Sequence, residues 1–151
     1  MSFLNAVINK VEDEVLNEML QERVDLVQHK IKFMEKVSVA CLDTENHLNC
    51  DLEGVINDAG GILQADMNQA RVIIYVEQGA SMLGMMGVVP SLLQKEWPAV
   101  EYNRVYLFED ATAAFSDPQS LVDAFEDIAE MLYPGYFIFG NEGKTWMSFA
   151  V

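Results

Sequence analysis

Four residues with chemically active side chains lie within ten positions of one another: Cys41, Asp43, His47 and Cys50. Thiolate, imidazole and carboxylate groups are ligands that zinc takes in proteins. Structural zinc sites, however, use closely paired cysteines, and no Cys-x-x-Cys pair occurs in this sequence. We therefore interpret the group as a buried cysteine at a strand end followed by a polar turn. No metal and no other cofactor is predicted.

Nucleophilic catalysis would need a base beside the nucleophile, and His29 and His47 are the two histidines of the chain. A pair of Cys41 or Cys50 with His47 would meet this need. No nucleophile elbow, phosphate-binding loop or dinucleotide glycine fingerprint accompanies it in the sequence. Carboxylate pairs are uninformative, because 24 acidic residues make some pairs certain. The sequence predicts a protein that is not an enzyme.

The charge is strongly negative, yet the chain is rich in apolar residues. Its 151 residues carry 9 basic and 24 acidic side chains, a net charge of −15, while 51% of them are hydrophobic. This apolar content excludes a disordered acidic tail. The shortage of basic residues excludes direct binding to nucleic-acid backbone or to an anionic membrane. Residues 37–151 hold 17 acids and four bases, so most of the charge, −13, lies after residue 36.

Part of this charge falls on one predicted helix. Asp117 is suited to cap it, Pro118 to its first position, and Pro134 and Gly135 to its end. Its apolar stripe consists of Leu121, Phe125, Ile128 and Leu132. The opposite face carries Asp123, Glu126, Asp127 and Glu130, with no basic residue in the helix to offset them. Two interpretations stay open, a merely solvated face and an electrostatic docking face.

The other elements are predicted from residue periodicity. Residues 1–36 are helical, as one bent helix or as a pair with a break near residues 21–23. Strands are expected at residues 37–42, 71–76 and 104–108, and short helices at residues 51–56 and 90–97. Residues 136–139 and 145–151 are expected to form a C-terminal β-hairpin. The order predicts one α+β domain over residues 1–151 with a mixed or antiparallel sheet.

The N-terminal residues show no basic segment followed by an apolar one, so no signal peptide is predicted. No stretch is long and apolar enough for a membrane span. We therefore expect a cytoplasmic protein with reduced cysteines.

The C-terminal third of the chain, from Leu107–Glu109 through the helix that follows to residues 133–143 and 146–150, resembles the SUKH superfamily. Its strand of the pattern Pro-Gly-Tyr, three apolar residues and Gly is matched by Pro134, Gly135, Tyr136 and Gly140, and a second apolar strand follows from Trp146. Many bacterial members of that superfamily are immunity proteins that neutralise toxins. The resemblance therefore implies an inhibitor.

Two hypotheses of function follow. The first is an acidic, non-enzymatic inhibitor of a basic protein, either a toxin or an enzyme whose nucleic acid it mimics. Its partner-binding residues would be Glu109, Asp110, Asp123, Glu126, Asp127 and Glu130, with Trp97 and Tyr102 as exposed aromatic anchors. The alternative is a phage or secretion-system assembly protein or chaperone that forms homo-oligomers, since nine methionines and a long helix suit buried subunit contacts.

Overall fold

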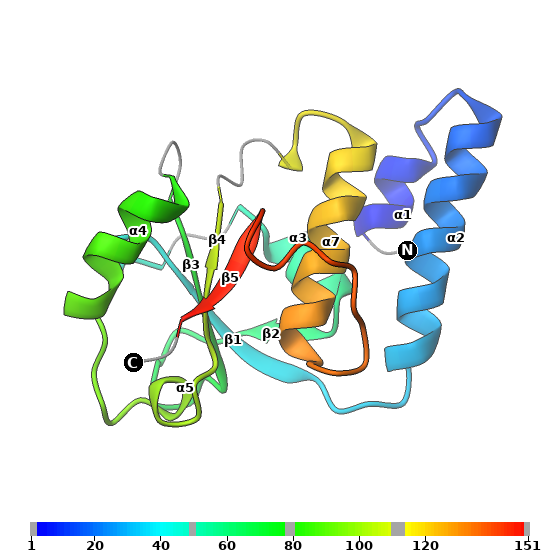
Figure 1. Ribbon diagram of the computed structural model, residues 1–151. Helices are drawn as coiled ribbons and strands as arrows, with labels where there is room; N and C mark the ends of the chain where they lie inside the picture. Colours follow the sequence, from blue (N-terminus) through cyan, green and yellow to red (C-terminus); the bar gives the residue numbers. More distant parts are fainter. Residues whose placement is uncertain (1–2, 49–50, 78–80, 110–113, 150–151) are drawn as a thin grey trace.

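The computed structural model describes residues 3–48, 51–77, 81–109 and 114–149. Its centre is a five-stranded sheet in the order β2-β1-β3-β4-β5 (Figure 1). The first four strands are parallel, and β5 runs antiparallel to β4. The strands are β1 (Val37–Leu42), β2 (Gly61–Leu63), β3 (Val72–Val76), β4 (Val105–Phe108) and β5 (Trp146–Phe149). Helices combined with a mixed sheet confirm the predicted α+β class.

Helices cover both faces of the sheet. They are α1 (Phe3–Ile8), α2 (Glu14–Ile31), α3 (Glu53–Asp58), α4 (Met82–Val88), the 3₁₀ helix η1 (Val89–Ser91), α5 (Pro98–Glu101) and α7 (Pro118–Leu132). Figure 1 shows α1, α2, α3 and α7 on one side of the sheet, and α4 and α5 on the other. A hydrophobic core fills each side. No helix within the described ranges combines the length and the apolar character that a membrane span requires.

The strands form where apolar, β-branched residues run together. All five residues of β3 are buried. Side chains alternate along a strand, so Val72 and Ile74 enter the core beneath α7, while Ile73 and Tyr75 enter the core beneath α4 and α5. Burial on both faces is typical of parallel strands between two helical layers.

The N-terminal segment is a helical pair, but its break lies earlier than predicted. Helix α1 ends at Ile8, and α2 begins after Asp13, whose carboxylate accepts hydrogen bonds from the backbone N–H groups of Val15 and Leu16. Helix α2 then continues without interruption through residues 21–23. Val15, in the first turn of α2, is 78% exposed. The buried stripe is Leu20, Val24, Val27 and Ile31.

Helix α7 matches its prediction. Asp117 Oδ1 accepts a hydrogen bond from the backbone N–H of Ser120 at 2.7 Å, and Pro118 is the first helical residue. The helix ends at Leu132, two residues before Pro134. Proline cannot continue a helix, because it lacks the N–H group and its ring clashes with the preceding turn.

The predicted C-terminal hairpin is wrong. Residues 136–139 form no strand, and β5 pairs instead with β4, in register from Phe108 opposite Trp146 to Val105 opposite Phe149. The backbone N–H of Phe139 is bonded to the Glu130 side chain, so it does not serve a hairpin ladder. The short helix predicted at residues 90–97 is also wrong: α4 forms at residues 82–88, η1 at residues 89–91 and α5 at residues 98–101.

Candidate ligand-binding site at the carboxyl edge of the sheet

A cavity of about 370 Å³ lies beyond the carboxyl end of β4. Its lining residues come mainly from the end of β4, the first turns of α7 and Thr145, which directly precedes β5. Its walls combine apolar, hydroxyl and carboxylate side chains. They are Phe108, Ala114 and Ala124; Ser120 and Thr145; and Glu109, Asp123 and Asp127. Open α/β sheets bind their ligands outside the carboxyl ends of the strands.

Asp127 is the distinctive member of this cavity. It is 1% exposed and is the one charged residue that is buried in the part of the chain the structure describes. Its Oδ1 accepts a hydrogen bond from Asn141 Nδ2 at 2.9 Å, and its Oδ2 accepts one from Thr145 Oγ1 at 2.7 Å. Burial raises the pKa of Asp127, and the hydrogen bonds from Thr145 and Asn141 offset part of that rise. A carboxylate is thus held in a largely apolar place by two neutral donors.

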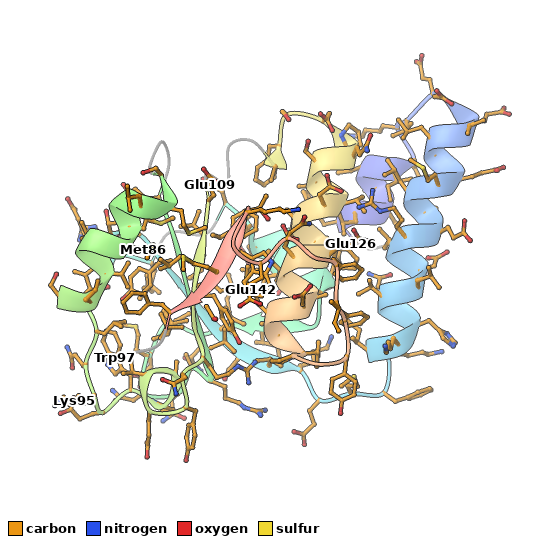
Figure 2. The ribbon with its side chains drawn as sticks, viewed as in Figure 1. Met86, Lys95, Trp97, Glu109, Glu126 and Glu142 are labelled. Carbon is orange, nitrogen blue, oxygen red and sulfur yellow. The ribbon has the colours of Figure 1, made fainter. Side chains whose placement is uncertain are left out.

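Arg23 of α2 binds two other acids of α7. Its Nη2 lies 2.5 Å from Asp123 Oδ1 and 2.5 Å from Glu126 Oε1, and its Nε donates to Glu126 Oε2 at 3.3 Å. Figure 2 shows Glu126 on the side of α7 that faces α2. The hydrogen bond with Glu126 is the main cause that raises the pKa of the Arg23 guanidinium. This ion-pair cluster joins the two longest helices.

The predicted docking face is therefore largely engaged within the protein. Asp123 and Glu126 bind Arg23, Asp127 binds the segment before β5, and Glu130 Oε1 accepts the backbone N–H of Phe139 at 2.7 Å. Helical periodicity put Asp127 with the other three acids on the face opposite the apolar stripe, but its prediction as an accessible docking residue is wrong, since its side chain is buried. Periodicity could not show that α2 and residues 139–145 pack over these acids, because those contacts link segments far apart in the sequence.

The remaining predicted partner-binding residues do not form one surface. Trp97 is 4% exposed and belongs to the core beneath α4 and α5, so its prediction as an exposed anchor is wrong. Figure 2 shows Trp97 and Glu109 in separate parts of the molecule. Tyr102 is 70% exposed, as expected, and Glu109 lines the cavity. Asp110 lies outside the described residues.

The loop after β1 completes this edge of the sheet. Tyr75, at the core of β3, donates a hydrogen bond of 2.7 Å from its hydroxyl to Asn46 Oδ1. Asn46 has a φ of 60°, in the left-handed region that asparagine tolerates better than most residues, and its Nδ2 donates to the carbonyl of Leu92. The Thr44 backbone N–H and hydroxyl both donate to Glu77, which follows β3. Tyr75 of the core and Glu77 directly after β3 thus hold the loop.

Of the group Cys41, Asp43, His47 and Cys50 from the sequence, His47 Nδ1 lies 3.7 Å from Asp43 Oδ2. Cys41 is buried in β1, the His47 side chain is 70% exposed, and Cys50 lies outside the described residues. Over the ranges that the structure covers, no three His, Cys, Asp or Glu side chains gather closely enough to hold a metal ion.

Sequence reasoning missed Arg23, Asn141 and Thr145 as functional neighbours of α7. Each lies in another segment, and no local pattern connects them to the helix. One signal did exist for Asp127. It directly precedes Ile128 of the apolar stripe, at the flank where the buried and exposed faces of the helix meet.

No family model matches the sequence, and no curated protein matches it. Solved structures do share its fold. An ABC transporter substrate-binding protein from Listeria monocytogenes EGD-e is 19% identical, with a TM-score of 0.62, over 79% of this chain and 56% of that one. A periplasmic binding protein from Veillonella parvula DSM 2008 is 14% identical, with a TM-score of 0.63, over 81% and 45%. A periplasmic heme-binding protein from Pseudomonas aeruginosa is 16% identical, with a TM-score of 0.52, over 80% and 51%.

This chain thus spans about half the length of the solved proteins it resembles. Those proteins are substrate-binding or periplasmic binding proteins, which overturns the inhibitor hypothesis with its basic protein partner and its assembly alternative. The predicted cytoplasmic location is wrong for the same reason. The expectation of a non-enzymatic protein agrees with the comparisons, because the solved structures that share the fold are described as binding proteins. The SUKH resemblance stays a prediction, because no family comparison tests it.

Proposed function

We propose that this chain binds a small ligand in the manner of the solute-binding proteins of transport systems. The ligand would lie at the carboxyl edge of the sheet, in the cavity between the end of β4 and the start of α7. The fold shared with substrate-binding proteins supports the proposal. So does the general preference of ligands for this edge of open α/β sheets.

The observation that carries the proposal is the composition of the cavity. Apolar walls supply most of the binding energy in small-molecule sites, and a few fixed polar groups orient the ligand. Phe108 and Ala124 are buried wall residues, and Asp127 is a polar group whose position is fixed by two hydrogen bonds. The cavity volume of about 370 Å³ suits a small organic molecule.

Ser120 offers a direct test, because it is half-buried, lines the cavity and lies in the first turn of α7. A Ser120→Phe variant would fill the space, whereas Gln119→Phe adds the same ring to the neighbouring exposed position. Calorimetric titration would use hemin, nickel with histidine, choline and agmatine as probes. We expect at least one probe to bind the wild type and Gln119→Phe and to lose at least about tenfold in affinity with Ser120→Phe.

Equal affinity of Ser120→Phe and the wild type would move the ligand away from this cavity. Absence of binding by every probe would contradict the proposal.

The same proposal implies that the protein acts outside the cytoplasm. Fractionation of the native host with an antibody would test this, and recovery in the cytoplasm alone would contradict it.

A further inference from the structure

The acidic residues that line the cavity are not offset by basic residues in the same lining. Three of its eight lining residues are acidic, Glu109, Asp123 and Asp127, and none of the eight is basic. Arg23 neutralises Asp123 from the side of α2 but bonds to neither of the other two. Glu109 is exposed at the mouth. A molecule entering this space therefore meets negative charge both at the mouth and inside.

Asp127 gives a second, independent observation. Buried carboxylates are ordinarily paired with a cation, because removal from water is costly for an isolated charge. Asp127 is 1% exposed, yet both of the groups that donate hydrogen bonds to it, Thr145 and Asn141, are neutral. The acids around it, Asp123 and Glu130, add to its electrostatic cost. No positively charged group of the described residues is therefore bonded to Asp127. The cavity beside it has room for a cationic ligand.

The spacing of the acids distinguishes between two kinds of cation. A metal ion needs several ligands within about 2–2.6 Å of one point. Across the described portions of the chain, no group of three acidic, histidine or cysteine side chains meets that need. An organic cation is larger, so it can reach separated carboxylates, and its carbon atoms can lie against Phe108, Ala114 and Ala124.

We propose that the cavity binds a compact organic cation, an ammonium or guanidinium compound, with its charged group directed to Asp127 and its apolar part against Phe108 and Ala124. Glu109 at the mouth would attract such a ligand and repel anions. This inference rests on the proposed function and names the ligand class of the same site. The hydroxyls of Ser120 and Thr145 add polar contacts in the same wall.

The test compares choline with 3,3-dimethylbutan-1-ol, which has nearly the same shape and no charge, with agmatine as a guanidinium probe. Calorimetric titration of the full chain should show binding of choline or agmatine, and affinity for the neutral alcohol at least about tenfold lower than for choline. Asp127→Asn should weaken cation binding at least about tenfold, because the negative charge is removed; the new amide oxygen can still accept from Asn141, and the Thr145 hydroxyl can accept from the new NH2 group. Glu109→Gln should weaken it a few-fold. Glu101→Gln removes one acid from α5, outside the cavity lining, and should leave it unchanged.

The outcomes separate this inference from the proposed function. Equal binding of choline and the neutral alcohol, both lost in Ser120→Phe, would overturn the cation and keep the ligand site. Binding of hemin or of nickel with histidine, with neither organic cation bound, would do the same. Unchanged cation affinity in folded Asp127→Asn would also overturn the inference. Failure of every probe would remove the proposed function as well. Circular dichroism of each variant shows whether it is folded, and Glu109→Gln supplies the charge test should Asp127→Asn not fold.

Discussion

The hydroxyl of Thr145, directly before β5, donates a hydrogen bond of 2.7 Å to Oδ2 of Asp127 on the buried flank of α7. Asn141 donates to the other oxygen of the same carboxylate. The bonds tie the segment that precedes the edge strand to the helix that covers the sheet. They also hold the Asp127 carboxylate at the wall of the cavity. Among the described residues, this is the only carboxylate that is buried.

Stability should depend on pH through Asp127. Its pKa is raised above the ordinary 3.8, so the folded state holds this proton more tightly than the unfolded state. As the pH rises from 3.8 through the raised pKa of the folded state, Asp127 must lose this proton. The free energy of unfolding therefore falls over that pH range. Asp123, Glu130 and Glu109 surround it with negative charge, while Arg23 bonds to Asp123 and not to Asp127.

An Asp127→Asn variant does not titrate at this position. The free energy of unfolding of the variant relative to the wild type should consequently increase from about pH 4 to about pH 7. Urea unfolding at several pH values, followed by circular dichroism, gives this difference. A difference that stays constant or falls with pH would show that burial does not penalise the charged form.

The Arg23 cluster should contribute measurably to stability. Arg23→Gln leaves Asp123 and Glu126 without their partner in a region that is partly shielded from water. We expect a loss of about 1–2 kcal/mol in the free energy of unfolding. Arg71→Gln is the matched control, because Arg71 lies 3.9 Å from Glu35 and both side chains are mostly exposed. Its effect should stay within about 0.5 kcal/mol. Equal losses in the two variants would contradict a special role for Arg23.

The Tyr75 hydroxyl should matter although it lies beneath the surface. Tyr75→Phe leaves the ring in the core but removes the donor to Asn46 Oδ1, and should cost about 1–2 kcal/mol. Tyr102→Phe makes the same chemical change at a ring that is 70% exposed and should be nearly neutral. Thermal unfolding of both variants measures the contrast. A neutral Tyr75→Phe would mean that the loop after β1 is fixed by other contacts.

The start of α2 should depend on its cap. Asp13→Ala removes the acceptor for the backbone N–H groups of Val15 and Leu16 and should cost about 1 kcal/mol. Glu18→Ala removes an exposed acid of the same helix after its first turn and serves as the control. If the two variants unfold at the same urea concentration, the break between α1 and α2 is set by packing and not by the cap.

Much of the fold could be predicted because its signals are local. Asp117, Pro118 and Pro134 fix the ends of α7 through backbone chemistry that acts within a few residues. The β-branched run of β3 identifies a buried strand in the same way. The pairing of β5 could not be predicted, since an apolar strand near the C-terminus is compatible with a hairpin and with the edge of an existing sheet.

The sequence by itself determined the acidic charge, the apolar content and the placement of four acids along one side of α7. The tertiary structure alone decided what those acids do. Arg23, 100 residues before Asp123, neutralises one end of the set, while the segment that leads into β5 covers Asp127. Helical periodicity relates residues three or four positions apart. Solvent exposure and charge pairing are set by whichever distant segment packs against them, and only the folded chain contains that information.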